Sequence, residues 1–306
     1  MKKVIVTGAT GFIGGALVKS LLDKDVIVYG VGRDVEKLSS FKNDNFIPIH
    51  LDMKDFEQLS ILVNDEIDVF YHLAWNGGFT TAFKDYELQL ENAKYACDAM
   101  KYAIEMKVKK FVYGGTINEI EIKQYLNDQT YKPRYTCIHA SAKVAGDMIC
   151  RTLAGNSGEI EYCTALIPMP YGIGNQSPQV LNILMKNCYN NLPTKLIEGN
   201  NKYDAVYVED IAEALYYVGE KGVNMQSYYV GHMQLESFRQ NMEFIRDSIN
   251  SKAELLFGEY PEALDLNYEL VDMKALQRDT GFKCPANRKE NILATAKWLI
   301  DIDKNI

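Results

Sequence analysis

The chain opens with a short apolar run that gives way to apolar positions spaced for a helix. β-Branched residues occupy positions 4–6, and Ile13, Leu17 and Leu21 then recur on one helical face. Several glycines separate the two patterns. This part of the sequence therefore predicts a strand, a glycine-rich turn and a helix.

The same alternation continues along the chain. Further strands are predicted for the apolar runs at 26–34, 46–52, 67–75, 109–116 and 160–172. Helical stretches fall between most of them, notably at 86–106. Strands and helices in alternation predict an α/β fold with a Rossmann-type doubly wound parallel sheet, whose ligands lie beyond the carboxyl ends of the strands. Asp52, Ala74, Thr116 and Tyr171 follow or end these strands, so we expect them at one edge.

A chain of 306 residues and 34.7 kDa is long enough for a large domain and an attached lobe. We predict a Rossmann domain over 1–170, completed by about 203–232, and a smaller substrate-binding lobe formed mainly by 171–306. The helix at 211–218 should return to the Rossmann domain. The last helix, around Trp298, is expected to serve packing.

The glycines of the first turn are spaced for binding a dinucleotide. Gly8 permits a tight turn, Gly11 lets the backbone approach a pyrophosphate, and Gly14 lets the helix pack closely on the strand. The negative charge of the ligand then meets the amino terminus of the helix. The spacing G-x-x-G-x-x-G is one residue longer than the simplest fingerprint, and its strand-turn-helix context matches what the motif requires.

The second predicted strand should bring its carboxyl end next to the adenosine ribose of the cofactor. Gly32 and Arg33 stand at that corner. An arginine there pairs with a 2′-phosphate, whereas an acidic residue would bind a free 2′-hydroxyl. Asp34 follows immediately and is the alternative contact to the ribose. The corner favours NADP over NAD.

Composition and charge narrow the class of partner. A formal net charge of -8 argues against a general affinity for nucleic acid or anionic membranes. The content of 47% hydrophobic and 24% charged residues is that of an ordinary soluble protein, and no apolar stretch approaches membrane-spanning length. The six cysteines form no C-x-x-C pair, and Met1 starts no charged-then-apolar segment. We expect a cytoplasmic protein with reduced thiols, and we assign no metal ligands.

Seven motifs occur in an order that resembles the extended short-chain dehydrogenase/reductase family. They are TGATGFIG, HLAW, Asn92, FVYGGT, Lys143, YGIG and YDAVYVEDIAEAL. The resemblance runs from about residue 1 to residue 218, with a weaker echo at 273–299. That family includes NAD(P)-dependent nucleotide-sugar epimerases, dehydratases and ketoreductases. The resemblance and the glycine turn together imply a cofactor site formed by Gly8, Thr10, Gly11, Phe12, Ile13, Gly14, Arg33, Asp52, Met53, Leu73, Ala74 and Lys143.

The resemblance also implies a catalytic group at Thr116, His139 and Lys143, with His139 at the position of the family's tyrosine. In such a group a hydroxyl polarises the substrate oxygen, a second residue shuttles its proton, and an ammonium holds the cofactor ribose. His139 and Lys143 lie one helical turn apart on one face. An imidazole is mostly neutral at pH 7, so His139 suits a base better than an acid. It is either a modified proton shuttle or a polar filler in a redox-impaired protein.

Other residues near this group bear on the substrate. Sugar dehydratases of the family carry an Asp-Glu pair directly after the threonine, and its absence here argues against dehydration. Glu119 and Glu121 either lie near the pocket or are solvated loop charges. Tyr131 and Tyr135 precede the His139 helix, and of these Tyr135 is the minor candidate for replacing the missing phenol.

The family pattern further suggests where a nucleotide-linked sugar would bind. Met169 stands where relatives often carry an asparagine, and Tyr203 where many carry a diphosphate-binding arginine, although Tyr203 is equally suited to the core. We take Trp75, Tyr135, Met169 and Tyr203 as candidate substrate contacts.

These inferences converge on a nucleotide-sugar epimerase or 4-ketoreductase that transfers hydride at a ring carbon. The alternative is an impaired family member that binds NAD(P) as a regulatory module. Apolar residues on the helix at 85–106 and on the helix after His139 predict a homodimer; they are Leu88, Ala96, Met100, Ala103, Val144, Met148 and Ile149.

Overall fold

The computed structural model of the protein describes residues 1–77, 81–128, 130, 132–261, 265–286 and 288–304, so that Tyr131 lies outside the described residues. Its centre is a seven-stranded parallel sheet in the order β11-β6-β5-β4-β1-β2-β3. The strands are β1 (Lys3–Thr7), β2 (Ile27–Gly32), β3 (Phe46–His50), β4 (Val69–His72), β5 (Lys110–Thr116), β6 (Glu161–Ile167) and β11 (Gln226–Tyr229). The order reverses between β1 and β4, as expected of a doubly wound sheet. The predicted fold class is confirmed.

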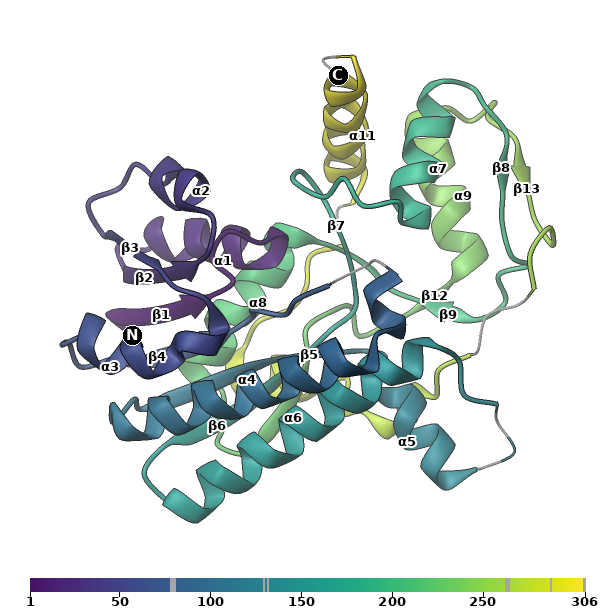
Figure 1. Ribbon diagram of the computed structural model, residues 1–306. Helices are drawn as coiled ribbons and strands as arrows, with labels where there is room; N and C mark the ends of the chain where they lie inside the picture. The colour runs from purple at the N-terminus through teal and green to yellow at the C-terminus, as the bar shows by residue number, and fades with distance from the viewer. Residues whose placement is uncertain (78–80, 129, 131, 262–264, 287, 305–306) are drawn as a thin grey trace.

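Helices cover both faces of this sheet (Figure 1). One face is covered by α1 (Phe12–Leu22) and α8 (Val208–Lys221), which pack on each other, and α10 (Ala275–Thr280) lies against α8. The other face carries α4 (Tyr86–Glu105) and α6 (Thr136–Ser157), with α5 (Glu119–Asn127) beside α6. The short helix α2 (Val35–Ser40) packs against β2 and β3 at one edge of the sheet, and the short helix α3 (Leu59–Leu62) packs against α4. Each face has its own apolar core, as two-layer burial of a central sheet requires.

A smaller lobe lies beyond the carboxyl edge of the sheet (Figure 1). Its helices α7 (Val180–Tyr189), α9 (Phe238–Ile249) and α11 (Lys289–Asp303) pack together around a separate apolar core, and Trp298 packs against that core. Its short strands are β8 (Thr194–Lys195), β9 (Lys202–Tyr203), β12 (Glu236–Ser237) and β13 (Leu255–Leu256). They form two-stranded pairs, β8 with β13 and β9 with β12.

The strand expected over 160–172 is divided in the structure. It forms β6 in the main sheet and, after Pro168, a separate strand β7 (Met169–Tyr171), which pairs with β10 (Ala205–Tyr207). Proline has no N–H for a sheet ladder, so the chain leaves the sheet at this residue. The division turns the chain from the sheet towards the lobe and buries Tyr171 in the lobe core, away from the edge where we expected it.

An ion pair between the half-buried His232 and the buried Asp204 connects the segment after β11 to the residue between β9 and β10. His232 Nδ1 lies 2.6 Å from Asp204 Oδ1, and its Nε2 lies 3.1 Å from the Pro285 carbonyl oxygen. Burial alone would lower the pKa of His232, but the hydrogen bonds to the Asp204 carboxylate and to the Cys284 sulfur raise this pKa to about 10. With both ring nitrogens facing acceptors, the imidazolium joins three segments of the chain.

The His232 pair makes folding stability depend on alkaline pH. The folded-state pKa of about 10 exceeds the unfolded value of about 6.5. The stabilisation is therefore complete below pH 6.5 and is lost as pH rises towards 10, at about 1 kcal/mol per pH unit. Urea unfolding at pH 7 and pH 10 should show this loss in the wild type and a much smaller one in His232→Gln. Equal losses in both proteins would contradict the prediction.

Within the described part of the chain, helices of membrane-spanning length and hydropathy are absent. The described residues also contain no cluster of three or more His, Cys, Asp or Glu side chains that could hold a metal ion.

Candidate active site

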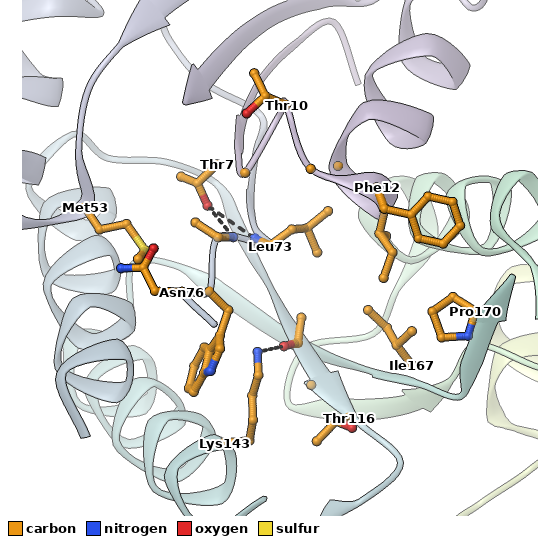
Figure 2. Close-up of a pocket in the computed structure, with 18 of the residues that line it drawn as sticks. Thr7, Thr10, Phe12, Met53, Leu73, Asn76, Thr116, Lys143, Ile167 and Pro170 are labelled. Carbon is orange, nitrogen blue, oxygen red and sulfur yellow. Dashed lines mark hydrogen bonds between the residues drawn. The ribbon is translucent and has the colours of Figure 1, made fainter. Parts of the chain in front are cut away.

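A cavity of about 400 Å³ lies at the carboxyl edge of the sheet, where β1, β2, β4, β5 and β6 end (Figure 2). Most side chains around it are apolar. The predicted site residues that line it are Gly8, Thr10, Gly11, Phe12, Ile13, Gly14, Arg33, Met53, Leu73, Ala74, Trp75, Thr116, His139, Lys143 and Met169. Segments far apart in the sequence thus meet at one edge of a parallel sheet.

The glycine turn forms one wall of the cavity. Gly8 has a positive φ of 72°, and its carbonyl oxygen accepts a hydrogen bond of 2.9 Å from the Gly11 N–H. A Cβ on Gly14 would lie 2.1 Å from that same oxygen, so only glycine allows α1 to start this close to the turn. Gly11 caps α1 without a side-chain bond, which leaves the first N–H groups of the helix for an anion.

Thr7 fixes the end of β4 against this turn. Its hydroxyl oxygen accepts hydrogen bonds from the backbone N–H groups of Leu73 and Ala74, at 3.2 and 3.3 Å (Figure 2). Thr7 is fully buried and also lines the cavity. The threonine thereby holds the two strand ends that the sequence assigns to the cofactor.

Lys143 is buried on α6 and points to the end of β5. Its Nζ donates a hydrogen bond of 2.7 Å to the Gly114 carbonyl oxygen and lies 3.7 Å from the centroid of the Trp75 ring (Figure 2). Burial lowers the pKa of Lys143 to about 7, although the nearby Glu119 carboxylate opposes this shift. Among the described residues, no carboxylate forms an ion pair with Lys143 Nζ, so the Gly114 carbonyl oxygen and the Trp75 ring hold it in place.

His139 lies one turn before Lys143 and is also buried. Its Nδ1 is 2.9 Å from Gln89 Oε1, and its ring stacks on Phe83 with centroids 4.4 Å apart. The Trp75 ring meets it edge-on at 5.6 Å. Burial, followed by the positive charge of Lys143, lowers the pKa of His139 to about 3. The imidazole is therefore neutral at physiological pH, so one of its ring nitrogens carries a free lone pair.

Thr116 ends β5 above a buried carboxyl group. Its backbone N–H donates to Glu119 Oε1 at 2.8 Å, and its Oγ1 accepts from the Asn118 N–H at 3.3 Å. Burial and then the charge of Asp147 raise the pKa of Glu119 to about 7. Glu119 holds the backbone of Thr116 through this hydrogen bond and does not line the cavity. Glu121 is also buried and pairs with Arg134 at 2.7 Å, so neither glutamate is a solvated loop charge.

Arg33 reaches the cavity from the end of β2, with its guanidinium 3.6 Å from the Asp52 carboxylate. Asp52 does not line the cavity; its other oxygen accepts from the Lys54 N–H and caps the following turn. Asp34 caps α2 in the same way through Lys37. The Asp52 carboxylate is therefore paired with the guanidinium at this corner, and the Asp34 carboxylate, one residue after Arg33, is paired with Lys37.

The structure does not bring two of the predicted substrate contacts to the cavity. Tyr135 precedes α6 with 57% of its surface exposed, and the Lys84 ammonium lies 4.9 Å above its ring. Tyr203 lies in the lobe core against Phe238, with ring centroids 5.1 Å apart. Tyr203 is thus a packing residue, because its place in the lobe points the ring inward. Trp75 and Met169 do line the cavity.

Other lining residues were not predicted from the sequence. Asn76 follows β4, and its backbone N–H and C=O bind the Asn92 side chain at 2.8 and 3.0 Å, which anchors this loop to α4. The Asn92 motif was the available signal for that anchor. For Phe83 the sequence offered no such signal, because this residue stands shortly before α4 and belongs to no recognisable motif. The further lining residues that we did not predict are Thr7, Val31, Gly32, Leu51, Phe56, Gly114, Gly115, Ile117, Asn118, Ile167, Pro168 and Pro170.

The glycine turn at the carboxyl edge of this parallel sheet is characteristic of a Rossmann-like α/β protein of the dinucleotide-binding class. The chain belongs to the NAD dependent epimerase/dehydratase family, whose model matches residues 4–231. The family resemblance read from the motifs is confirmed. An uncharacterized protein of Methanocaldococcus jannaschii is 22% identical, over 98% of this chain and 97% of the relative.

Solved structures of similar proteins share the fold over nearly the whole chain. UDP-glucose 4-epimerase of Thermotoga maritima, solved with UDP-glucose, is 19% identical with a TM-score of 0.79, covering 98% of this chain and 99% of that one. UDP-N-acetylglucosamine 4-epimerase of Methanobrevibacter ruminantium, solved with UDP-N-acetylmuramic acid, is 20% identical with a TM-score of 0.80 and the same coverage. UDP-glucuronic acid 4-epimerase of Bacillus cereus, solved with UDP-glucuronic acid and NAD, is 19% identical with a TM-score of 0.77, and the match covers 98% of this chain and 99% of that one. At these identities the likeness concerns the fold.

Proposed function

We propose that this protein is an NAD-dependent epimerase of a nucleotide-linked sugar, which inverts a ring carbon by removing and returning hydride. The observation that carries the proposal is that Thr116, His139 and Lys143 line the same cavity as the glycine turn. Family membership supports a reaction of this class. The residues fit the cofactor, because the glycine turn lines the cavity and no described side chain caps the first N–H groups of α1 there.

Each catalytic side chain has a separate task in this proposal. When bound, the nicotinamide supplies the acceptor and later the donor of hydride. The Thr116 hydroxyl donates a hydrogen bond to the substrate oxygen. The neutral His139 accepts the hydroxyl proton and later returns it, and the Lys143 ammonium holds a ribose hydroxyl. Trp75 and Phe83 shield the reacting carbon from water.

The lobe, which is formed mainly by residues within 171–306, is proposed to bind the nucleotide end of the substrate. The similar structures solved with UDP-linked sugars support a UDP-sugar as the substrate class. Met169 lies where the sheet passes into the lobe and lines the cavity, so it would contact the sugar.

The test is a panel of UDP- and dTDP-linked sugars incubated with purified protein and NAD. Redox-neutral interconversion of two C4 epimers supports the proposal. Net oxidation of NADPH by a 4-keto sugar nucleotide would instead identify a 4-ketoreductase, the other function that the sequence suggests. Tight dinucleotide binding without turnover of any sugar would favour a regulatory binding module, for which the replacement of tyrosine by His139 is the motivating feature.

Cofactor choice is the next prediction. The NADP preference inferred from Arg33 gains no support from the similar structures, one of which contains NAD. We expect NAD to bind about tenfold more tightly than NADP, because Asp34 and Asp52 would oppose a 2′-phosphate at this corner. Calorimetry with both dinucleotides measures the ratio.

Two variants test the basis of this ratio. Asp52→Asn should raise NADP affinity by freeing Arg33, since asparagine also caps the following turn. Arg33→Ala should leave NAD affinity within about twofold. Tighter binding of NADP than NAD by the wild type would restore the original sequence-based prediction.

A homodimer through α4 and α6 is also proposed. Ala96, Met100 and Ala103 belong to the monomer core, but Met148 and Ile149 on α6 are 54% and 49% exposed. On α4, Tyr86 and Leu90 are 60% and 58% exposed. Apolar side chains on two adjacent helices suit a two-fold interface. A cytoplasmic location remains a prediction from the cysteines.

A further inference from the structure

Gln89 occupies a central position behind the candidate proton shuttle. It lies on α4, is fully buried, and does not itself line the cavity. Its Oε1 is 2.9 Å from Trp75 Nε1 and 2.9 Å from His139 Nδ1. Its Nε2 is 3.0 Å from the Ala82 carbonyl oxygen. One amide therefore contacts two lining aromatic side chains and the backbone before α4.

The chemistry of these partners fixes which end of the amide faces which neighbour. An indole N–H only donates hydrogen bonds, and a backbone carbonyl oxygen only accepts them. A flipped Gln89 would set its NH₂ group against Trp75 Nε1–H and its oxygen against the Ala82 oxygen, losing both bonds. The orientation with Oε1 towards Trp75 is thus required by the hydrogen-bond network. The same oxygen then faces His139.

His139 has no freedom of tautomer in this arrangement. Oε1 of Gln89 is an acceptor, so Nδ1 of His139 must carry the hydrogen that joins them. We propose that Gln89 is a positioning residue that holds His139 in the Nδ1–H tautomer, so that Nε2 offers a lone pair and the imidazole acts on the substrate as a proton acceptor. The catalytic part of this inference rests on the proposed function.

The step that this tautomer permits is oxidation of a hydroxyl-bearing carbon. The substrate O–H proton moves to His139 Nε2, and the O–H electron pair forms the C=O bond. The hydrogen on carbon leaves with its electron pair to the oxidised nicotinamide dinucleotide, which is thereby reduced. The return step reverses both transfers, and His139 gives back the proton from Nε2. The Nδ1–H bond to Gln89 is unchanged throughout, so the ring stays in place.

Nuclear magnetic resonance reads the tautomer without any substrate. In the full-length protein labelled with ¹⁵N-histidine, long-range ¹H–¹⁵N correlation spectra distinguish Nδ1–H from Nε2–H. The chain has four histidines, and the signal lost in His139→Asn identifies the relevant one. We expect Nδ1–H in the wild type and its loss in Gln89→Leu. In Gln89→Glu a protonated carboxyl group can reproduce both contacts, so the Nδ1–H tautomer should persist.

A matched control separates positioning from general damage to a buried glutamine. Gln124 is 8% exposed and bonds through its amide to the backbone of Asp265 and Asn267, away from the cavity. Gln124→Leu should leave the His139 tautomer as it is. Once a substrate is known, Gln89→Leu should lower kcat about 10- to 100-fold with dinucleotide affinity unchanged, and Gln89→Glu should restore most of it.

The outcomes separate this inference from the proposed function. An Nε2–H signal for wild-type His139, or an Nδ1–H signal that survives in Gln89→Leu, overturns the role of Gln89 even if sugars are epimerised. The expected tautomer in a protein that turns over no sugar nucleotide supports the positioning role and rejects the epimerase.

Discussion

His139→Ala is expected to lower kcat for the sugar substrate about 10²- to 10⁴-fold, the usual contribution of a positioned acid-base group. The dinucleotide should bind as before, because its expected contacts come from the glycine turn and Lys143. KM should change little, since the imidazole acts mainly on the proton in flight. Steady-state kinetics with an identified UDP-sugar and calorimetry with NAD measure the two effects separately.

The other histidine variants make this result specific. His50 is exposed on β3, and His50→Ala should behave as the wild type. His139→Tyr restores the phenol of the family pattern one turn before Lys143, but it loses the bond to Gln89 and must fit between Phe83 and Trp75. If His139→Ala keeps full activity, the imidazole shuttle is wrong. If only His139→Tyr is active, the chain is a decayed enzyme.

The fold was predictable because its determinants are local. Apolar runs and helical spacing gave the strands and helices, and the glycine turn identified where the sheet begins. Pro168 was visible in the sequence, yet the run around it is apolar throughout, so periodicity alone did not divide it. The lobe was harder to predict, because strands such as β8 and β9 have two residues each and depend on tertiary pairing.

The candidate site was predictable where a motif or a strand end marks it. Thr116 ends a predicted strand, and His139 and Lys143 share a helical face. The role of Tyr203 was ambiguous, because the residue type alone does not indicate whether the ring faces the cavity or the lobe core. Gln89 was missed altogether. Its contacts to Trp75 and His139 span 14 and 50 residues, and such long-range bonds leave no local pattern.

Gly14→Ala is expected to weaken dinucleotide binding at least about 100-fold and to destabilise the fold by about 3 kcal/mol. The added Cβ would lie 2.1 Å from the Gly8 oxygen, 2.8 Å from the Gly8 carbonyl carbon and 3.3 Å from the Ala9 nitrogen. All three atoms are backbone, so relief requires α1 to move away from β1 and the turn. That movement would displace the N–H groups that are to receive the pyrophosphate.

The next residue of the same helix provides the control. A Cβ on Gly15 would meet its nearest atom, the Ala9 oxygen, at 3.5 Å, which is ordinary contact. Gly15→Ala should therefore bind NAD as the wild type does and gain about 0.5 to 1 kcal/mol from the better helix propensity of alanine. Two neighbouring glycines thus have opposite expected effects, and urea unfolding with calorimetry distinguishes them. If Gly14→Ala binds NAD as tightly as Gly15→Ala, the pyrophosphate does not lie at this turn, and the placement of the nicotinamide beside Lys143 fails with it.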